Sequence, residues 1–268
     1  MTVKKILFIN AFALLTMGAF SSCKKEGCTD DTATNYNSSA TSDDGSCIHE
    51  EPTPSAGAPS GYTPTFNGVF ATLVGVKAVS TTSTPIGPID TEIGTAVAVF
   101  SEDAAASFIS AGTVSVDGTN LAAQSNNSYV YTPGTSNPTG LSFGGTLSWS
   151  GTGAAWPSFN ASTSVGFPNV TDISSGNVTM SSNYTLNCGS AVTADSIYFA
   201  VYGPDGTAMK VVAGGTSSYT FTAAELGAVG AGSGFVQIVG INYDLQNISG
   251  RDYYLLNETA RTKSVTIN

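Results

Sequence analysis

The stretch Ile197-Tyr-Phe-Ala-Val-Tyr-Gly-Pro-Asp-Gly-Thr-Ala-Met-Lys-Val-Val212 places two apolar runs on either side of Pro204-Asp-Gly206. β-Branched and aromatic residues favour strands, and Pro-Asp-Gly supplies the backbone angles that a tight turn requires. We therefore expect a β-hairpin here. Similar runs separated by Gly, Pro and Asn recur on both sides of it, so this pattern indicates the fold class of most of the chain.

Further strand candidates surround this hairpin. Residues 114–121 contain Asp117-Gly118, a pair that favours the type I′ turn of a second hairpin. Thr222 and Glu225 have capping-box spacing, which indicates one short helical turn. The remaining strand candidates are residues 66–79, 95–100, 129–131, 147–149, 178–186, 235–243, 253–256 and 264–267.

Regularly spaced strands with turn residues between them are typical of β-sandwiches and barrels. We predict an all-β fold with two tandem Ig-like β-sandwiches, over residues 65–164 and 165–268. One larger jelly-roll-like sandwich is the alternative, because the two blocks show no strong repeat and lack the Cys…Trp…Cys signature of true Ig domains.

The N-terminus predicts export. Lys4 and Lys5 precede an apolar run over residues 6–19, and Ser21-Ser22-Cys23 follows. This run is too short to span a bilayer comfortably and has the order of a signal peptide, which we place at residues 1–22. Its removal lowers Lys plus Arg from 9 to 7 against 19 acids, a formal charge of −12. Such a chain is a poor partner for nucleic acid.

Small residues directly before Cys23 resemble the lipobox of bacterial lipoproteins, in which the cysteine is diacylated and becomes the first residue. Lys24-Lys25-Glu26 partly resembles the surface-export signal of lipoproteins from the Bacteroidota. These resemblances imply an outer-membrane lipoprotein anchored through Cys23 and exposed at the cell surface. A periplasm-facing or secreted protein is the alternative.

Residues 28–47 contain the anchors Cys28-Thr-Asp, Ala-x-Asn-Tyr-Asn and Asp43-Asp44-Gly-Ser-Cys47. They closely resemble a short cysteine-bounded module of secreted and surface proteins of the Bacteroidota. The resemblance implies a surface setting and no particular activity. A Cys28–Cys47 bond would close a loop of about twenty residues and stabilise it by roughly 3 kcal/mol.

The acids of this module raise the question of calcium. Asp30, Asp31, Asp43 and Asp44 could supply oxygen ligands to Ca²⁺, but their spacing does not match an EF-hand loop. A solvated acidic loop is the favoured interpretation, so we expect no cofactor. Residues 23–51 hold seven acids and few core-forming residues, and residues 52–64 form a Pro/Gly/Ser linker. Together they are expected to be a disordered tether.

The cysteine count leaves one thiol over. If Cys23 is lipidated and Cys28 pairs with Cys47, Cys188 has no partner. We expect a buried free thiol at this position, since free cysteine behaves as a small apolar residue. The alternative is that Cys23 carries no lipid and the four cysteines form two bonds.

Catalysis is disfavoured by the residue inventory. His49 is the only histidine and lies in the tether, which excludes Ser-His-Asp, Cys-His and clustered zinc sites in the β-region. A carboxylate pair for glycoside hydrolysis is formally open. The candidate acids for such a pair are Glu92, Glu102, Asp103, Glu225 and Glu258. None of them lies in a recognisable acid/base motif. We expect no enzyme.

The leading hypothesis is a cell-envelope lipoprotein with a non-catalytic binding or adhesion role, with glycan as the candidate ligand. Trp149, Trp156 and Tyr243 are candidate platforms because flat rings stack on sugar faces, although ordinary core packing explains each of them singly. Further candidates are Tyr129, Tyr131, Tyr253 and Tyr254. A structural or assembly subunit that binds protein by strand addition is the alternative, and a polysaccharide hydrolase is third.

Overall fold

The computed structural model describes residues 25–29, 35–44, 46, 68–84, 86–103 and 107–268. The chain divides into two compact units, residues 1–55 and 56–268, and the larger unit holds every named strand. Nearly all of its regular structure is β, which confirms the predicted class. No helix among the described residues is long and apolar enough to cross a membrane.

Fourteen strands and one short helix make up the described part of this unit. They are β1 (Phe70–Thr84), β2 (Gly87–Ser101), β3 (Val114–Val116), β4 (Thr119–Asn120), β5 (Ala122–Ala123), β6 (Tyr129–Tyr131), β7 (Leu147–Gly151), β8 (Phe159–Thr163), β9 (Tyr184–Asn187), β10 (Ser196–Tyr202), β11 (Thr207–Ala213), β12 (Ser218–Phe221), α2 (Ala223–Leu226), β13 (Gly232–Ile248) and β14 (Arg251–Ile267).

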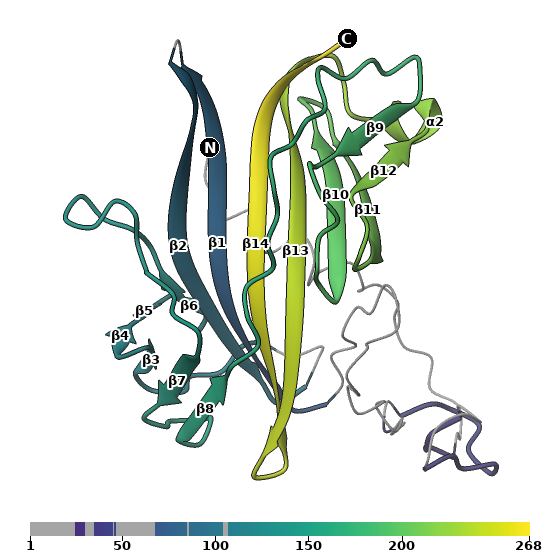
Figure 1. The fold of residues 1–268 in the computed structure, drawn as a ribbon. Coiled ribbons are helices and arrows are strands. Elements are labelled where there is room, and N and C mark those ends of the chain that lie inside the picture. The colour runs from purple at the N-terminus through teal and green to yellow at the C-terminus, as the bar shows by residue number, and fades with distance from the viewer. Residues whose placement is uncertain (1–24, 30–34, 45, 47–67, 85, 104–106) are drawn as a thin grey trace. The chain divides into compact units, whose positions relative to one another are not determined.

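One large sheet organises the unit. Its eight strands follow the order β11-β10-β13-β14-β1-β2-β6-β5, and the long strands β13, β14, β1 and β2 lie side by side at its centre (Figure 1). β1 and β14 are parallel, whereas all other neighbours are antiparallel. A four-stranded sheet, β4-β3-β7-β8, and a two-stranded sheet, β12-β9, complete the unit.

Two hydrophobic cores lie on the same face of the large sheet. Alternate residues of a strand point to the same side, so the odd-numbered residues of β14 share one face. Tyr253 and Leu255 belong to the first core, together with β3, β7 and β8. Val265 and Ile267 belong to the second core, together with β9, β12 and α2. β14 therefore passes under both cores, since 17 residues extend over roughly 56 Å.

The predicted boundary near residue 164 separates two cores and does not separate two sheets. The first core takes its residues from 71–161 and adds Tyr253 and Leu255, while the second takes 170–267. The two predicted blocks thus correspond to two cores. However, β1 pairs with β14 from Phe70 to Ser80, so a single sheet runs through both blocks. Sequence could not show this, because the two strands are far apart along the chain.

The segment that joins the blocks crosses the middle of the sheet. A Cβ on Gly75 or Gly240 would come within 2.7 Å of side chains packed above the sheet, so glycine at these positions lets residues 165–170 approach. Asn257 donates to the carbonyl of Val165, and Arg261 Nε donates to that of Val170 at 3.0 Å. Residues 165–170 are therefore held on the sheet by hydrogen bonds from its side chains and not by pairing of backbone groups.

Local structure follows the sequence closely at three turns. Asp117 and Gly118 both have positive φ, 46° and 76°, as a type I′ hairpin requires. The capping box of α2 is formed, with Thr222 Oγ1 accepting from Glu225 N and Glu225 Oε2 from Thr222 N. The β10–β11 hairpin also forms as predicted. By contrast, the strand predicted over 178–186 begins only at Tyr184, because Ser-Ser-Asn precedes it and favours a turn.

Candidate functional site

The two tryptophans predicted as platforms are core residues. Trp149 is 2% exposed and Trp156 is fully buried. Trp156 packs against Phe100 and Tyr253, and its Nε1 donates to Tyr253 Oη at 2.8 Å. Both indoles fill the first core. Core packing, which the sequence analysis gave as the ordinary explanation for these residues, therefore accounts for them. As they lie, neither offers a face to a ligand.

Tyr243 lies on the opposite face of the large sheet. It pairs with Leu256, whose side chain points away from both cores. Burial raises the pKa of the Tyr243 hydroxyl far above its ordinary value. The structure therefore does not bring Trp149, Trp156 and Tyr243 together on one surface.

The candidate acids are spread over separate elements. Glu102 pairs with Arg251 at 2.9 Å, and Lys77 lies 3.9 Å from Glu92. Glu225 caps α2 and accepts from Tyr219 Oη at 3.0 Å; the hydrogen bonds it accepts, Thr222 foremost, lower its pKa. Asp103 is exposed at the end of β2. Structural roles thus account for Glu92, Glu102 and Glu225.

Glu258 differs from the other acids. It lies on β14 between Ile241 of β13 and Val76 of β1, on the face opposite the two cores. Burial raises the pKa of this carboxyl to about 7. An ionised carboxylate is poorly solvated among such neighbours, so the neutral form is favoured.

The acidic module is described only in part. Asp44 Oδ1 accepts from Ser46 N at 2.9 Å, and hydrogen bonds from Ser46 lower the pKa of Asp44. Cys28 is buried, but Cys23, Asp30, Asp31 and Cys47 lie outside the described residues, so their predicted roles stay predictions. In the described part, no group of three or more His, Cys, Asp and Glu is placed to hold a metal ion.

Cys188 is buried and is not bonded to another cysteine, as the cysteine count predicted. It packs in the second core, where its Sγ donates to the carbonyls of Ser190 and Ser217, both at 3.2 Å. Burial raises the pKa of this thiol. Cys188 is therefore an unreactive core residue.

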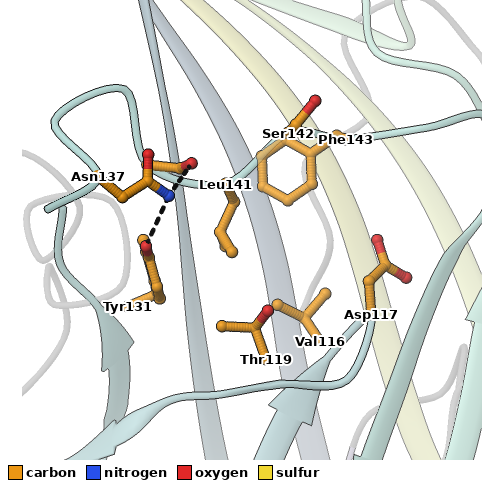
Figure 2. A pocket seen from close by; sticks show the side chains of 9 residues that line it. Val116, Asp117, Thr119, Tyr131, Asn137, Leu141, Ser142 and Phe143 are labelled. Carbon is orange, nitrogen blue, oxygen red and sulfur yellow. Dashed lines mark hydrogen bonds between the residues drawn. The ribbon is translucent and has the colours of Figure 1, made fainter.

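A pocket of about 340 Å³ lies beside the first core (Figure 2). It is bounded by the β3–β4 hairpin, the end of β6 and the loop that follows β6. Figure 2 shows side chains from all three elements around a common hollow. The lining residues are Val116, Asp117, Thr119, Tyr131, Asn137, Gly140, Leu141, Ser142 and Phe143.

Hydrogen bonds hold the loop wall of this pocket. Asn137 Nδ2 donates to Tyr131 Oη at 3.3 Å and to the carbonyl of Gly140 at 2.7 Å. Leu141 N donates to Gly94 O on β2 at 2.9 Å, and a Cβ at Gly140, where φ is 72°, would lie only 2.0 Å from that oxygen. Glycine at this position lets the loop dock on β2, which places the Asn137 amide beside the Tyr131 hydroxyl.

The hairpin wall presents a carboxylate. Asp117 Oδ1 accepts from Ser148 N at 2.8 Å, and its backbone N–H donates to Ser148 O at 2.8 Å. The Asp117 side chain is exposed, so its second oxygen can accept from a ligand. Backbone geometry thus fixes this acceptor at the rim.

Aromatic surface completes the pocket. Phe143 is half-buried and stacks on Phe167, with ring centroids 4.9 Å apart and planes inclined by 23°. The Lys77 ammonium lies over the other ring of this pair, 4.9 Å from the Phe167 centroid. Tyr131 is also half-buried. Two supported rings therefore stand beside amide, hydroxyl and carboxylate groups.

Sequence reasoning found one residue of this pocket in advance, Tyr131. Asp117 and Thr119 were predicted only as parts of the hairpin over residues 114–121, and Asn137 and Phe143 carried no signal above an ordinary loop. No protein-family model matches the chain, and comparison with curated proteins finds no significant match.

Proposed function

We propose that this chain is a non-catalytic lipoprotein of the cell envelope whose β-region binds an uncharged glycan in the pocket beside β6. The observation that carries this proposal is the pocket itself, with Tyr131 and Phe143 next to the outward oxygen of Asp117. Sugar rings offer apolar C–H faces to aromatic side chains and hydroxyl donors to carboxylates.

The volume of the pocket and the net charge of the chain restrict the class of glycan that can bind. A pocket of about 340 Å³ lies at the small end of the usual range for small-molecule sites, which suits one or two sugar units. The strongly acidic chain repels polyanions, so sulfated or uronic-acid polymers are unsuitable. Envelope attachment rests on the resemblance around Cys23, and its test is mass spectrometry of the mature N-terminus.

Binding is tested with an array of neutral glycans, followed by calorimetry on the best ligand. Tyr131→Ala and Asp117→Asn are each expected to weaken binding about tenfold, a loss of about 1.4 kcal/mol. Asn tolerates the left-handed backbone at position 117, so this variant keeps the turn. The matched control is Asp205→Asn, an exposed residue of the same unit that does not line the pocket.

The assembly-subunit hypothesis also has an observation in its favour. β11 is an edge strand of the large sheet, and Met209 on it is 41% exposed. An edge strand can pair with a strand from another protein. A stable hetero-complex after mild extraction, lost in Val211→Pro, would favour this alternative over glycan binding.

A further inference from the structure

The hydrogen bonds of Asn137 fix the direction of the Tyr131 hydroxyl. The carbonyl of Gly140 can only accept, so the Asn137 atom 2.7 Å from it is the amide nitrogen Nδ2. On the other side of this amide, Oδ1 accepts from Thr139 Oγ1 at 3.3 Å. Nδ2 carries two hydrogens and cannot accept, so its second hydrogen is donated to Tyr131 Oη at 3.3 Å. Tyr131 Oη is therefore the acceptor in this bond.

Tyr131 consequently presents a hydrogen-bond donor to the pocket. Because its Oη accepts from Asn137, the phenolic proton is available to another partner. Within the described residues, no other hydrogen bond reaches Tyr131 Oη. Tyr131 lines the pocket and is half-buried, so a ligand that enters the pocket meets a donor on this wall.

Asp117 presents the opposite chemistry, because a carboxylate only accepts. Its Oδ1 accepts from Ser148 N at 2.8 Å, and its second oxygen has no hydrogen-bond partner among the described residues. Figure 2 shows Asp117 and Tyr131 on opposite sides of the hollow. One wall of the pocket therefore donates a hydrogen bond and the other accepts one.

The surface between these two walls is largely apolar. Val116 and Leu141 lie between them in Figure 2, together with the ring of Phe143. All three belong to the first core or pack against it, so they form a fixed surface. Thr119 adds a hydroxyl, which can donate or accept and so does not discriminate between ligands. A polar group over the apolar surface would lose water without gaining a partner, whereas a methyl group gains by contact.

A donor, an acceptor and an apolar surface between them match the acetamido group of a sugar. This group is a planar trans amide, so its carbonyl oxygen and its N–H point in opposite directions. It also carries a methyl group and no charge. A hydroxyl group can meet either wall but offers nothing to the apolar surface, and the methyl group of a 6-deoxy sugar comes without an amide.

We propose that the pocket recognises the N-acetyl group of a 2-acetamido sugar. The carbonyl oxygen of the sugar accepts from Tyr131 Oη, its N–H donates to Asp117, and its methyl group packs on Leu141. Asn137 is a positioning residue, since it directs the Tyr131 proton without touching the sugar. This inference rests on the proposed function, because it specifies which neutral glycan occupies the same pocket.

The test is a nuclear magnetic resonance titration of the purified chain with methyl glucosides that differ only at C2. The probes carry an acetamido, a hydroxyl or an ammonium group there. The acetamido sugar is expected to bind about tenfold more tightly than the hydroxyl sugar. Equal affinity for these two would overturn the inference and leave the proposed function intact, and binding of no sugar would overturn both. Tightest binding of the ammonium sugar would also overturn it, because Asp117 would then act through its charge.

Two variants test the assigned roles. Tyr131→Phe keeps the ring and removes the proton, so it should weaken the acetamido sugar about fivefold and leave the hydroxyl sugar nearly unchanged. Asn137→Asp should reduce the same preference, because its carboxylate would take the Tyr131 proton. A purely structural role for either residue would weaken both sugars by one factor, which would contradict the assignment. Tyr202→Phe, at a half-buried tyrosine that does not line the pocket, is the matched control.

A second measurement reports how the sugar is oriented. In a saturation-transfer experiment the acetamido methyl group is expected to receive the strongest signal from the protein, because it packs on the side chain of Leu141. Strongest transfer to protons of the sugar ring far from C2 would overturn the inference. So would equal affinity for N-acetylalanine methylamide, which carries the same amide without a sugar and would show that the pocket binds peptide.

Discussion

The two cores on the large sheet are built from different side chains. The first contains Trp149, Trp156 and Tyr129, whose polar atoms need partners; Tyr129 Oη, for example, accepts from Ala111 N at 2.9 Å. The second contains more Val, Leu and Ile and no tryptophan; its buried aromatic residues are Tyr184, Phe199 and Phe221, and Cys188 is a small apolar member. Aromatic packing with hydrogen bonds restricts geometry, whereas aliphatic packing tolerates rearrangement. The pocket lies beside the first core, to which Val116 belongs and against which Tyr131, Leu141 and Phe143 pack.

The largest effect is expected from Trp156→Ala. It removes a fully buried indole, three ring contacts including the Arg251 guanidinium 4.4 Å above it, and the bond to Tyr253. The free energy of unfolding should fall by about 4 kcal/mol, measured by urea denaturation. Leu226→Ala in the second core is the matched comparison and should cost about 3 kcal/mol. An equal or larger loss there would contradict the contrast between the cores.

Glu258 tests the face that neither core covers. Its pKa is about 7 in the folded chain against 4.5 ordinarily, so between these values the folded chain binds more protons than the unfolded chain. The contribution of Glu258 to the free energy of unfolding is therefore most favourable below about pH 4.5, and it declines as the pH rises from there to about 7. Glu258→Gln should remove this decline and add roughly 2 to 3 kcal/mol at pH 8, with little change at pH 5. Parallel pH profiles for parent and variant would show that the carboxyl is solvated.

Arg261→Met tests how the two cores are joined. Arg261 connects β14 with Asp90 and, through Asp172 and the Val170 carbonyl, with the segment between the blocks. Both carboxylates are partly exposed and can be solvated, so the loss should be only about 2 kcal/mol. Thermal unfolding followed separately by near-ultraviolet and far-ultraviolet signals should then separate into two transitions. Coincident transitions would mean that the shared sheet alone couples the cores.

The smallest effect is expected at the helix cap. Thr222→Ala removes the side-chain acceptor for Glu225 N at the edge of the second core and should cost about 1 kcal/mol. Thr222→Ser keeps the acceptor and serves as the control. A loss beyond 2 kcal/mol, measured by the same urea titration, would show that α2 supports the core more than its four residues suggest.

Prediction from sequence succeeded where the controlling interactions are local. The Asp117-Gly118 turn, the Thr222–Glu225 box and the Ile197–Val212 hairpin each depend on residues a few positions apart. The pocket was beyond this reasoning, because Asp117 and Asn137 come from separate elements that meet only after the sheets pack. Trp149 and Trp156 carried the strongest aromatic signal, yet the largest rings have the most to gain from burial.

By itself the sequence determined the all-β class and the three turns named above, because residue type sets backbone preference; it favoured a buried free thiol at Cys188 but left a second disulfide open. Only the tertiary structure decided that β1 joins β14, that both cores share one face, and that Tyr131 meets Asn137 and Asp117 around a pocket. Pairing between distant strands depends on how their side chains pack against a third element, and no local pattern contains that information.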